Sequence, residues 1–517
     1  MGDPPIDDAW WRCNRLSWKR SLILRPTFKS IMIRASLLLI LLGQTLFAQA
    51  QEPAPADEET IFSPEQIVAD FDSMYEGLQS ANFDLYAFTP RSEFDDRYRE
   101  IRRSFVRPMT RFEAEMAFQP FVALAHQSHT RIESDYSGYI AYRAAGGAGF
   151  PLAVVAGSER LTVTENFSGT SEIRPGDRIV AINGTGVADL LPRMTAHISA
   201  ETPEFAYVLL ERYLPLVIWL ELGPAEAYSV SVDHAGGGSG TYEISATSAG
   251  ERDDRDQDTP FTLEGRDARM LSDTVAYLRP GPFHNTDPGA NSLDTTEFLA
   301  FIDRAFGNFI ENRAERLILD LRDNPGGDNS FSDPVIAWFA DRPFRFSSDF
   351  RIRVSPQSTA ANQARLESHP SGGNSVSRLY AELYASTENG RTVSFPIPEV
   401  RPRSAGRFEG DVYVLVNRYS FSNAVSAAAL IQDYDFGVIM GEKTVDMATT
   451  YGAMERFTLP NTGIVVAYPK ALIIRPNGNS SVHPVSPDVP LPAPRIRGSR
   501  DVMLDAALVH IRSDSPD

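Results

Sequence analysis

After residue 60, the pattern of hydrophobic and polar positions first indicates a helical region. Three stretches have apolar residues recurring at helical spacing, and they cover residues 64–79, 92–106 and 111–126. Ser63 with Gln66, and Thr110 with Glu113, have the spacing of a capping box, in which each side chain bonds the other residue's backbone amide. Residues 61–138 are therefore expected to form a small helical domain.

Short β-type runs separated by glycine follow, and they predict a separate β-rich module over residues 139–247. The runs are residues 152–155, 161–164, 178–182 and 228–232. Asn183 and Gly184 indicate a hairpin turn after the third run. The glycine-rich stretch 236–240 and the charged stretch 251–258 indicate a linker at the end of the module.

Strand-like and helix-like runs alternate between residues 262 and 495, and this alternation predicts a layered α/β domain. The expected strands are residues 274–278, 316–321, 411–416 and 437–440, and the expected helices are residues 295–313, 332–340 and 423–432. Residues 496–517 are expected to be a C-terminal tail. The fold class that follows is α/β, in a chain of several domains.

The N-terminal 50 residues differ from the rest. A basic stretch precedes the apolar run Ala35–Phe47, which is shorter than the ~20 residues that a membrane-spanning helix needs. The run ends in Ala48-Gln49-Ala50, a small-x-small cleavage pattern. Residues 1–50 are therefore predicted to be a signal peptide cleaved near Ala50 and followed by a linker over residues 51–60. An uncleaved anchor is the alternative, and in both cases the protein is expected to be periplasmic or secreted.

Composition excludes several kinds of chemistry. The formal net charge of −19 makes the chain a poor binder of nucleic acid. Its one cysteine, Cys13, lies in the predicted signal peptide, so a mature chain has no thiol for a disulfide, a metal site or a nucleophile. The histidines lack zinc-binding spacing, and the chain has no nucleotide-binding loop of the known glycine-rich types. We therefore expect neither a metal nor a cofactor.

Two segments of the α/β region have residues suited to acyl transfer. One strand runs into Asn324-Pro325-Gly326-Gly327, where paired glycines let backbone N–H groups approach a ligand. About a hundred residues later, Ser422 begins an alanine-rich helix. The N–H groups and the dipole at a helix N-terminus favour developing negative charge. Ser422 is therefore a candidate nucleophile, although a serine at this position is also a common helix cap.

Together these segments resemble the superfamily of C-terminal processing (tail-specific) and tricorn-core-like serine peptidases. The shared motifs lie at residues 317–327, Ser422, residues 441–444 and Pro487-Asp488. Residues 173–184 resemble the core of a PDZ domain. The resemblance implies a crotonase-like or ClpP-like core at residues 262–495 and a PDZ-like domain at residues 139–247. It also implies an exported serine endopeptidase or carboxyl-terminal processing peptidase that acts on peptides through an acyl-enzyme on Ser422.

The superfamily has two catalytic variants, and the resemblance favours one of them here. The Ser-Lys variant would place its lysine where this chain has Met447, and Lys443 lies off that position. The Ser-His variant matches Ser128-His129. The resemblance therefore implies that His129 is the general base and Ser128 its orienting partner. His126 is a rival for the role of base.

The resemblance also implies an oxyanion hole, made by the backbone N–H groups of Gly327 and Asn423 beside Gly326. One feature of the Ser-His variant is missing, because residues 479–484 hold no glutamate to orient the histidine. Glu455 and Asp446 are candidate substitutes. Without that acid, two further functions remain open: a weak or inactive peptide-binding protein on the same fold, and an acyl-ester hydrolase.

Overall fold

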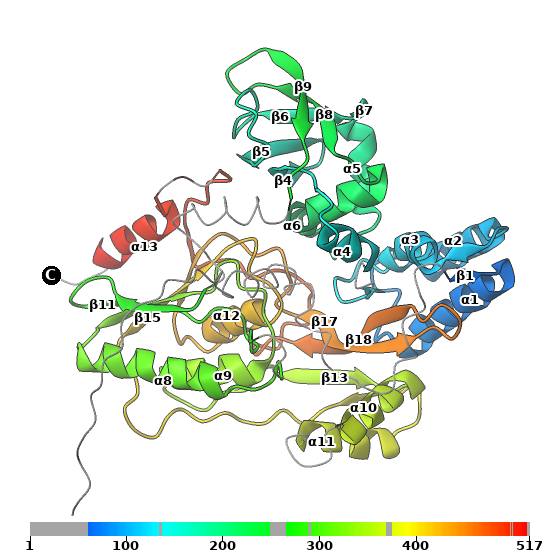
Figure 1. Cartoon of the computed structure of the whole chain (residues 1–517). Coiled ribbons are helices and arrows are strands. Elements are labelled where there is room, and N and C mark those ends of the chain that lie inside the picture. The colour runs from blue at the N-terminus through cyan, green and yellow to red at the C-terminus, as the bar shows by residue number, and fades with distance from the viewer. Residues whose placement is uncertain are drawn as a thin grey trace, which may run out of the picture. The chain divides into compact units, whose positions relative to one another are not determined.

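A computed structural model of the 517-residue chain is shown in Figure 1. It describes residues 60–133, 137–248, 265–287, 291–368, 375–496, 498 and 500–513. All of them belong to one compact unit, Leu41–Asp517. The predicted signal peptide, Cys13, nearly all of the predicted linker at 51–60 and the charged stretch 251–258 lie outside the described residues.

The N-terminal region forms the three predicted helices and two short strands. They are β1 (Ile61–Phe62), α1 (Pro64–Ala81), α2 (Arg91–Ser104), β2 (Met109–Thr110) and α3 (Arg111–Ala123). Both capping boxes, at Ser63 and at Thr110, are present as predicted. The third helix ends earlier than expected. Its continuation is blocked at His126, whose φ of 48° belongs to the left-handed region.

The module contains an antiparallel sheet with the four predicted strands. Its strands are β4 (Leu152–Gly157), β5 (Arg160–Asn166), β6 (Arg178–Ile182), β7 (Thr185–Gly186), β8 (Ala227–Asp233) and β9 (Ser239–Ser245), in the order β4-β5-β6-β8-β9 with β7 on β6. Asn183 and Gly184 both have positive φ in the tight turn between β6 and β7, which confirms the predicted hairpin.

One expectation for the module was wrong, and its helices were not predicted. The stretch 236–240 is not a linker, because it forms the turn and the start of the last strand in the β8–β9 hairpin. The unpredicted helices are α4 (Ser137–Ala144), α5 (Val187–Thr195) and α6 (Pro203–Leu222). Helix α6 buries apolar residues around much of its circumference, so its sequence lacks the polar face that identifies a surface helix.

The predicted α/β region is built on a six-stranded sheet that is mostly parallel. Its strands are β10 (Asp267–Met270), β11 (Val275–Arg279), β12 (Arg316–Asp320), β15 (Asp411–Val416), β16 (Val438–Gly441) and β19 (Val489–Pro490), in the order β10-β11-β12-β15-β16-β19. Strand β10 pairs antiparallel with β11, and the other pairs are parallel. The fold class is α/β, as expected.

Helices cover both faces of this sheet. On one face, alternate strand residues such as Leu317, Leu319 and Val414 pack with α8 (Thr296–Glu311), α9 (Asn329–Ala337) and α12 (Asn423–Asp433). On the other face, the intervening residues such as Ile318 and Leu415 pack with α13 (Val502–Ser513). Burial on both faces explains why these strands are continuously apolar in sequence. The expected tail therefore includes a helix that packs on the core.

A second, antiparallel sheet was not predicted. It has the order β14-β13-β18-β17, from β14 (Thr392–Ser394), β13 (Asp349–Arg353), β18 (Val465–Ile474) and β17 (Thr450–Thr458), and β3 (Arg131–Ile132) also pairs with β18. Strands β13, β17 and β18 are labelled in Figure 1. Helices α10 (Pro356–Ser368) and α11 (Ser375–Ala385) lie between β13 and β14 in the chain. Val466 and Tyr468 of β18 share a core with α1 and α3. The N-terminal helices thus bury their apolar faces on this sheet.

Within the described ranges, every helix is too short or insufficiently apolar to cross a membrane.

Candidate active site

Ser422 stands at the start of α12 in a strained backbone conformation. Its φ of 50° and ψ of −123° are rare for a residue with a side chain, and its hydroxyl makes no capping hydrogen bond to the helix. The alternative that Ser422 is an ordinary helix cap is therefore wrong. Its backbone N–H donates instead to the carboxylate of Asp446, which helps to hold the strained conformation.

The turn at Gly326 and Gly327 lies directly against Ser422. A Cβ atom built on Gly326 would lie 2.8 Å from the Cβ of Ser422 and 2.7 Å from the backbone nitrogen of Asn423. Gly326 has a φ of 82° and Gly327 a φ of 138°. Neither the Gly327 amide nor the Asn423 amide donates a hydrogen bond to any residue that the structure describes. Two backbone donors thus lie beside the serine.

Hydrogen bonds join the two segments that meet there. The side chain of Asn324 donates to Gly281 O at 2.8 Å and accepts from Gly326 N at 2.8 Å. The amide of Phe421 donates to Asn324 O at 2.9 Å. One residue further back, Ser420 Oγ donates to Leu321 O at 2.8 Å. The glycine turn and the segment before Ser422 are therefore fixed to each other.

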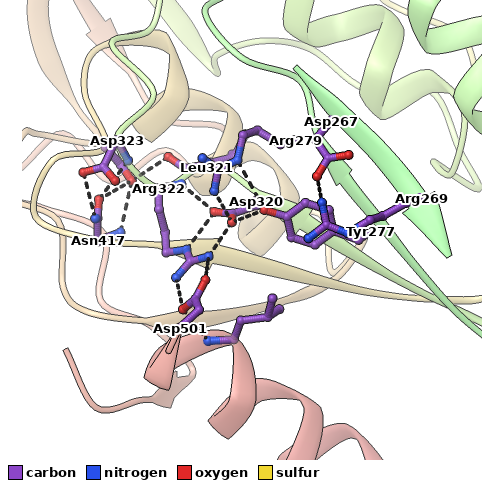
Figure 2. Close-up of polar contacts among 12 residues, drawn as sticks. Asp267, Arg269, Tyr277, Arg279, Asp320, Leu321, Arg322, Asp323, Asn417 and Asp501 are labelled. Atoms are coloured by element: carbon purple, nitrogen blue, oxygen red, sulfur yellow. Dashed lines mark hydrogen bonds and ion pairs between the residues drawn. The ribbon is translucent and has the colours of Figure 1, made fainter. Parts of the chain in front are cut away.

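An ion network lies in the core at the end of β12, the strand that precedes the glycine turn, and Figure 2 shows its residues. Asp320 accepts hydrogen bonds from Arg279, Arg322 and Tyr277 at 2.6 to 2.7 Å, and Arg322 also contacts Asp501 at the start of α13. Burial alone raises the pKa of Asp320, but the two guanidinium groups outweigh it and hold that pKa well below its usual range. The network links β11, β12 and the start of α13. It therefore holds the strand that leads to the glycine turn in a fixed position.

His129 is buried against the segment that precedes Ser422. Its ring stacks on that of Phe421, the residue before Ser422, with the ring centroids 6.2 Å apart. Burial lowers the pKa of His129 to about 4, and the nearby charge of Arg131 adds to the effect. The imidazole is therefore neutral near pH 7, which is the form that accepts a proton. His126, by contrast, is exposed.

Ser128 lies between His129 and an acid that the sequence did not indicate. Its Oγ is 3.4 Å from His129 Nδ1 and 3.2 Å from Glu201 Oε1, and its amide donates to the same Oε1 at 3.1 Å. Glu201 comes from the segment between α5 and α6 of the module. Nothing in its local sequence marks it, because the contact joins residues 73 positions apart.

The other candidate groups are placed as follows. Asp446 accepts from the amides of Ser422 and Met447, and burial raises its pKa to about 6. Glu455 is held in buried ion pairs with Arg365 and Lys470, so it is not placed to orient His129. Lys443 is exposed, as expected for a residue outside the site. No group of three His, Cys, Asp or Glu side chains in the described ranges is arranged to hold a metal ion.

Comparison with known proteins finds a family match over part of the chain and a shared fold. Residues 276–491 match the model of peptidase family S41. Among solved structures, a serine-to-alanine mutant of CPAF has a TM-score of 0.58 at 16% identity, covering 83% of this chain and 93% of that one. Mature CPAF has a TM-score of 0.55 at 15% identity, covering 87% and 96%. These likenesses show a shared fold over most of both chains. No curated protein matches the sequence.

Proposed function

We propose that this chain, a member of peptidase family S41 by its residues 276–491, cleaves peptide bonds with Ser422 as its nucleophile. The family match confirms the predicted serine-peptidase superfamily, so the enzyme is a serine peptidase. Family membership does not identify the residues that act. Their proposed roles rest mainly on one observation, the close approach of Gly326 to Ser422 with two unbonded amides beside it.

In the proposed reaction, Ser422 Oγ attacks the peptide carbonyl carbon while His129 accepts the hydroxyl proton. The carbonyl oxygen gains negative charge, and the amides of Gly327 and Asn423 donate hydrogen bonds to it. When the intermediate collapses, the C–N bond breaks and His129 gives the proton to the leaving amine. Water then adds to the acyl-enzyme with the same base, which releases the new carboxylate and restores Ser422.

The module is proposed to bind the peptide outside the reaction site. Support comes from the PDZ-like pattern of residues 173–184 and from the antiparallel sheet, whose edge strands are β4 and β9. An extended peptide can add to such an edge through backbone hydrogen bonds. We also retain three assignments: helical residues 61–138, a PDZ-like domain at 139–247 and a catalytic core at 262–495. An N-terminal signal peptide and a periplasmic or secreted location complete this proposal.

Three single substitutions test the assigned roles. Ser422→Ala is expected to abolish peptide turnover, and His129→Ala to lower it by about 10²-fold or more, because both act in the proton transfer. The control His126→Ala, at an exposed position, is expected to keep turnover within about twofold. Rates on an unstructured peptide, with folding checked by circular dichroism, provide the measurement.

The outcomes separate the alternatives. Turnover by Ser422→Ala equal to that of the wild type would refute the assigned nucleophile. Faster turnover of short-chain esters than of peptides would favour the acyl-ester hydrolase. A folded wild-type protein that turns over neither substrate, but binds peptide, would favour the inactive binding protein.

A further inference from the structure

A histidine base must hold its hydrogen on the ring nitrogen that faces away from the nucleophile. A hydrogen-bond partner on that far nitrogen selects this tautomer. None of the acids that the sequence suggested in the peptidase core is placed to orient His129. Residues 479–484 contain none, and Glu455 is held by Arg365 and Lys470. The carboxylate of Asp446 accepts from the amides of Ser422 and Met447. The backbone of Tyr451 in β17 also hydrogen-bonds the imidazole of His129, but it is uncharged and cannot ionise. An acid that acts on His129 therefore has to be sought elsewhere in the structure.

Ser128 lies between His129 and the carboxylate of Glu201 and connects them. Its hydroxyl has one hydrogen, and its Oγ lies 3.2 Å from Glu201 Oε1 and 3.4 Å from His129 Nδ1. If the hydroxyl donates to the carboxylate, the hydrogen between Ser128 and His129 must come from Nδ1. The other ring nitrogen, Nε2, then has a free lone pair and can act as the base. The acid thus selects the tautomer through the serine.

The segment that contains Glu201 is also bonded to Gln127, the residue before Ser128. Ser199 Oγ donates to Gln127 O at 2.7 Å and accepts from Gln127 N at 3.0 Å. Glu201 Oε1 also accepts from Ser128 N at 3.1 Å. Two successive residues before His129 are therefore bonded to the segment between α5 and α6. Such bonds fix the direction in which the imidazole leaves the backbone.

We propose that Glu201, which belongs to the module and not to the peptidase core, is the positioning residue that sets the tautomer of His129 through Ser128. This inference rests on the proposed function, because it assumes that His129 is the base for Ser422. Under this proposal, the ability of His129 to act as a base depends on contact between the module and the core.

The surroundings of Glu201 determine how pH acts on this arrangement. Its Oε2 is buried and has no hydrogen-bond partner among the described residues. Burial, followed by the charge of Asp446, raises the pKa of Glu201 to about 8. Tyr451 also faces this group, and its own pKa is raised to about 12, chiefly by burial. Arg131 lies on the other side of Ser128 and donates to its carbonyl at 3.2 Å.

The sign of the effect follows from that pKa. Below pH 8 Glu201 is mostly protonated and neutral, and above pH 8 it is a carboxylate. The carboxylate holds the Ser128 hydrogen more strongly and stabilises the imidazolium formed in the reaction. Reaction at Ser422 is therefore expected to accelerate as the pH rises through about 8.

The test measures the rate at which a fluorophosphonate probe labels Ser422 between pH 6 and 9.5, in the full-length wild type and three variants. Glu201→Ala removes the acceptor and is expected to lower the rate about 10²-fold. Glu201→Gln keeps an oxygen acceptor but cannot ionise. We expect it to recover at least tenfold over Glu201→Ala and to lose the rise near pH 8. Glu204→Gln, an exposed acid on α6, is the matched control and is expected to resemble the wild type.

The results distinguish this proposal from the one on which it rests. In one outcome, the folded wild type is labelled at Ser422, and Glu201→Ala reacts within twofold of it with the same pH profile. This result refutes the role of Glu201 but leaves the proposed nucleophile standing. A folded wild type that is not labelled at Ser422 refutes the proposed nucleophile. Equal losses in Glu201→Ala and Glu201→Gln, with the rise near pH 8 intact, would indicate a purely structural contact and also overturn the inference.

Discussion

Gly326 lies where a side chain would meet Ser422 and Asn423, two residues of the proposed site, directly. Its φ is 82°, and an added Cβ would lie 2.6 Å from Phe421 O and 2.7 Å from Asn423 N. These neighbours are backbone atoms of residues held by other hydrogen bonds, because Phe421 O accepts from Ala424 N and the Asn423 side chain donates to Ser332 Oγ. They cannot move aside at low cost. The position therefore requires glycine for two separate reasons, its conformation and its surroundings.

A matched pair of variants separates these two reasons. Gly478 has the same φ of 82° but no atom within 4 Å of an added Cβ. Gly478→Ala is expected to cost about 1–2 kcal/mol of unfolding free energy and leave turnover unchanged. Gly326→Ala is expected to cost more and to lower turnover at least 10²-fold, because it displaces Ser422 and Asn423. Urea unfolding and peptide turnover measure both effects; equal behaviour of the two variants would contradict this geometry.

Some residues of the proposed site could be identified from the sequence, and others could not. Gly326, Gly327 and Ser422 lie in contiguous motifs whose order and spacing resemble a known superfamily, so they could be named in advance. Glu201 could not, because its carboxylate meets Ser128 only through a tertiary contact 73 positions away. The strained φ of Ser422 was equally hidden, since serine is ordinarily found at helix starts as a cap.

At the scale of elements, helix α6 connects the module to the segment before the nucleophile. Phe205 at its start packs edge-on against Phe421, with the ring centroids 5.4 Å apart. Nearly two turns further on, Glu211 accepts from Arg418 at 2.9 Å and from Tyr419 Oη at 2.6 Å. The same carboxylate accepts from the amide of Ala156 in β4 at 2.8 Å. One acid thus joins the edge of the module's sheet to the residues before Ser422.

Disruption of this ion pair should be costly unless both partners are removed. The side chains of Glu211 and Arg418 are only 4% and 10% exposed, so Glu211→Gln leaves a buried guanidinium without its counter-charge. We expect a loss of about 3–5 kcal/mol in unfolding free energy. The double variant with Arg418→Met should lose less than the sum of the single losses, by about 2 kcal/mol. Additive losses in denaturant unfolding would show that the two groups do not interact.

Sequence reasoning identified the elements that have a regular spacing of apolar residues or a recognisable helix cap. Both capping boxes predicted helix starts correctly, and the apolar strands of the parallel sheet were recognised by length and by the helices between them. Helix α6 was missed because it is buried widely enough to hide its helical period. The antiparallel sheet of β13, β14, β17 and β18 was missed because two helices separate β13 from β14, and both of these strands lie far in the chain from the paired strands β17 and β18.

At the scale of the whole molecule, the proposed site is assembled from three distant parts of the chain. Strand β3 pairs with β18 of the second sheet, and this pairing brings the preceding His129 to the core. The module supplies Glu201, and the parallel sheet supplies Ser422 together with the glycine turn. No single region contains a nucleophile, a base and an acid, so the chemistry depends on how the regions pack against one another.

A crystal structure of the protein after reaction with a fluorophosphonate tests this assembly most directly. We predict phosphorus bonded to Ser422 Oγ, with the phosphoryl oxygen about 3 Å from the amides of Gly327 and Asn423 and with His129 Nε2 facing Oγ. An adduct on another residue would contradict the assembly. So would a phosphoryl oxygen that points away from both amides, or a His129 ring that remains distant from the adduct.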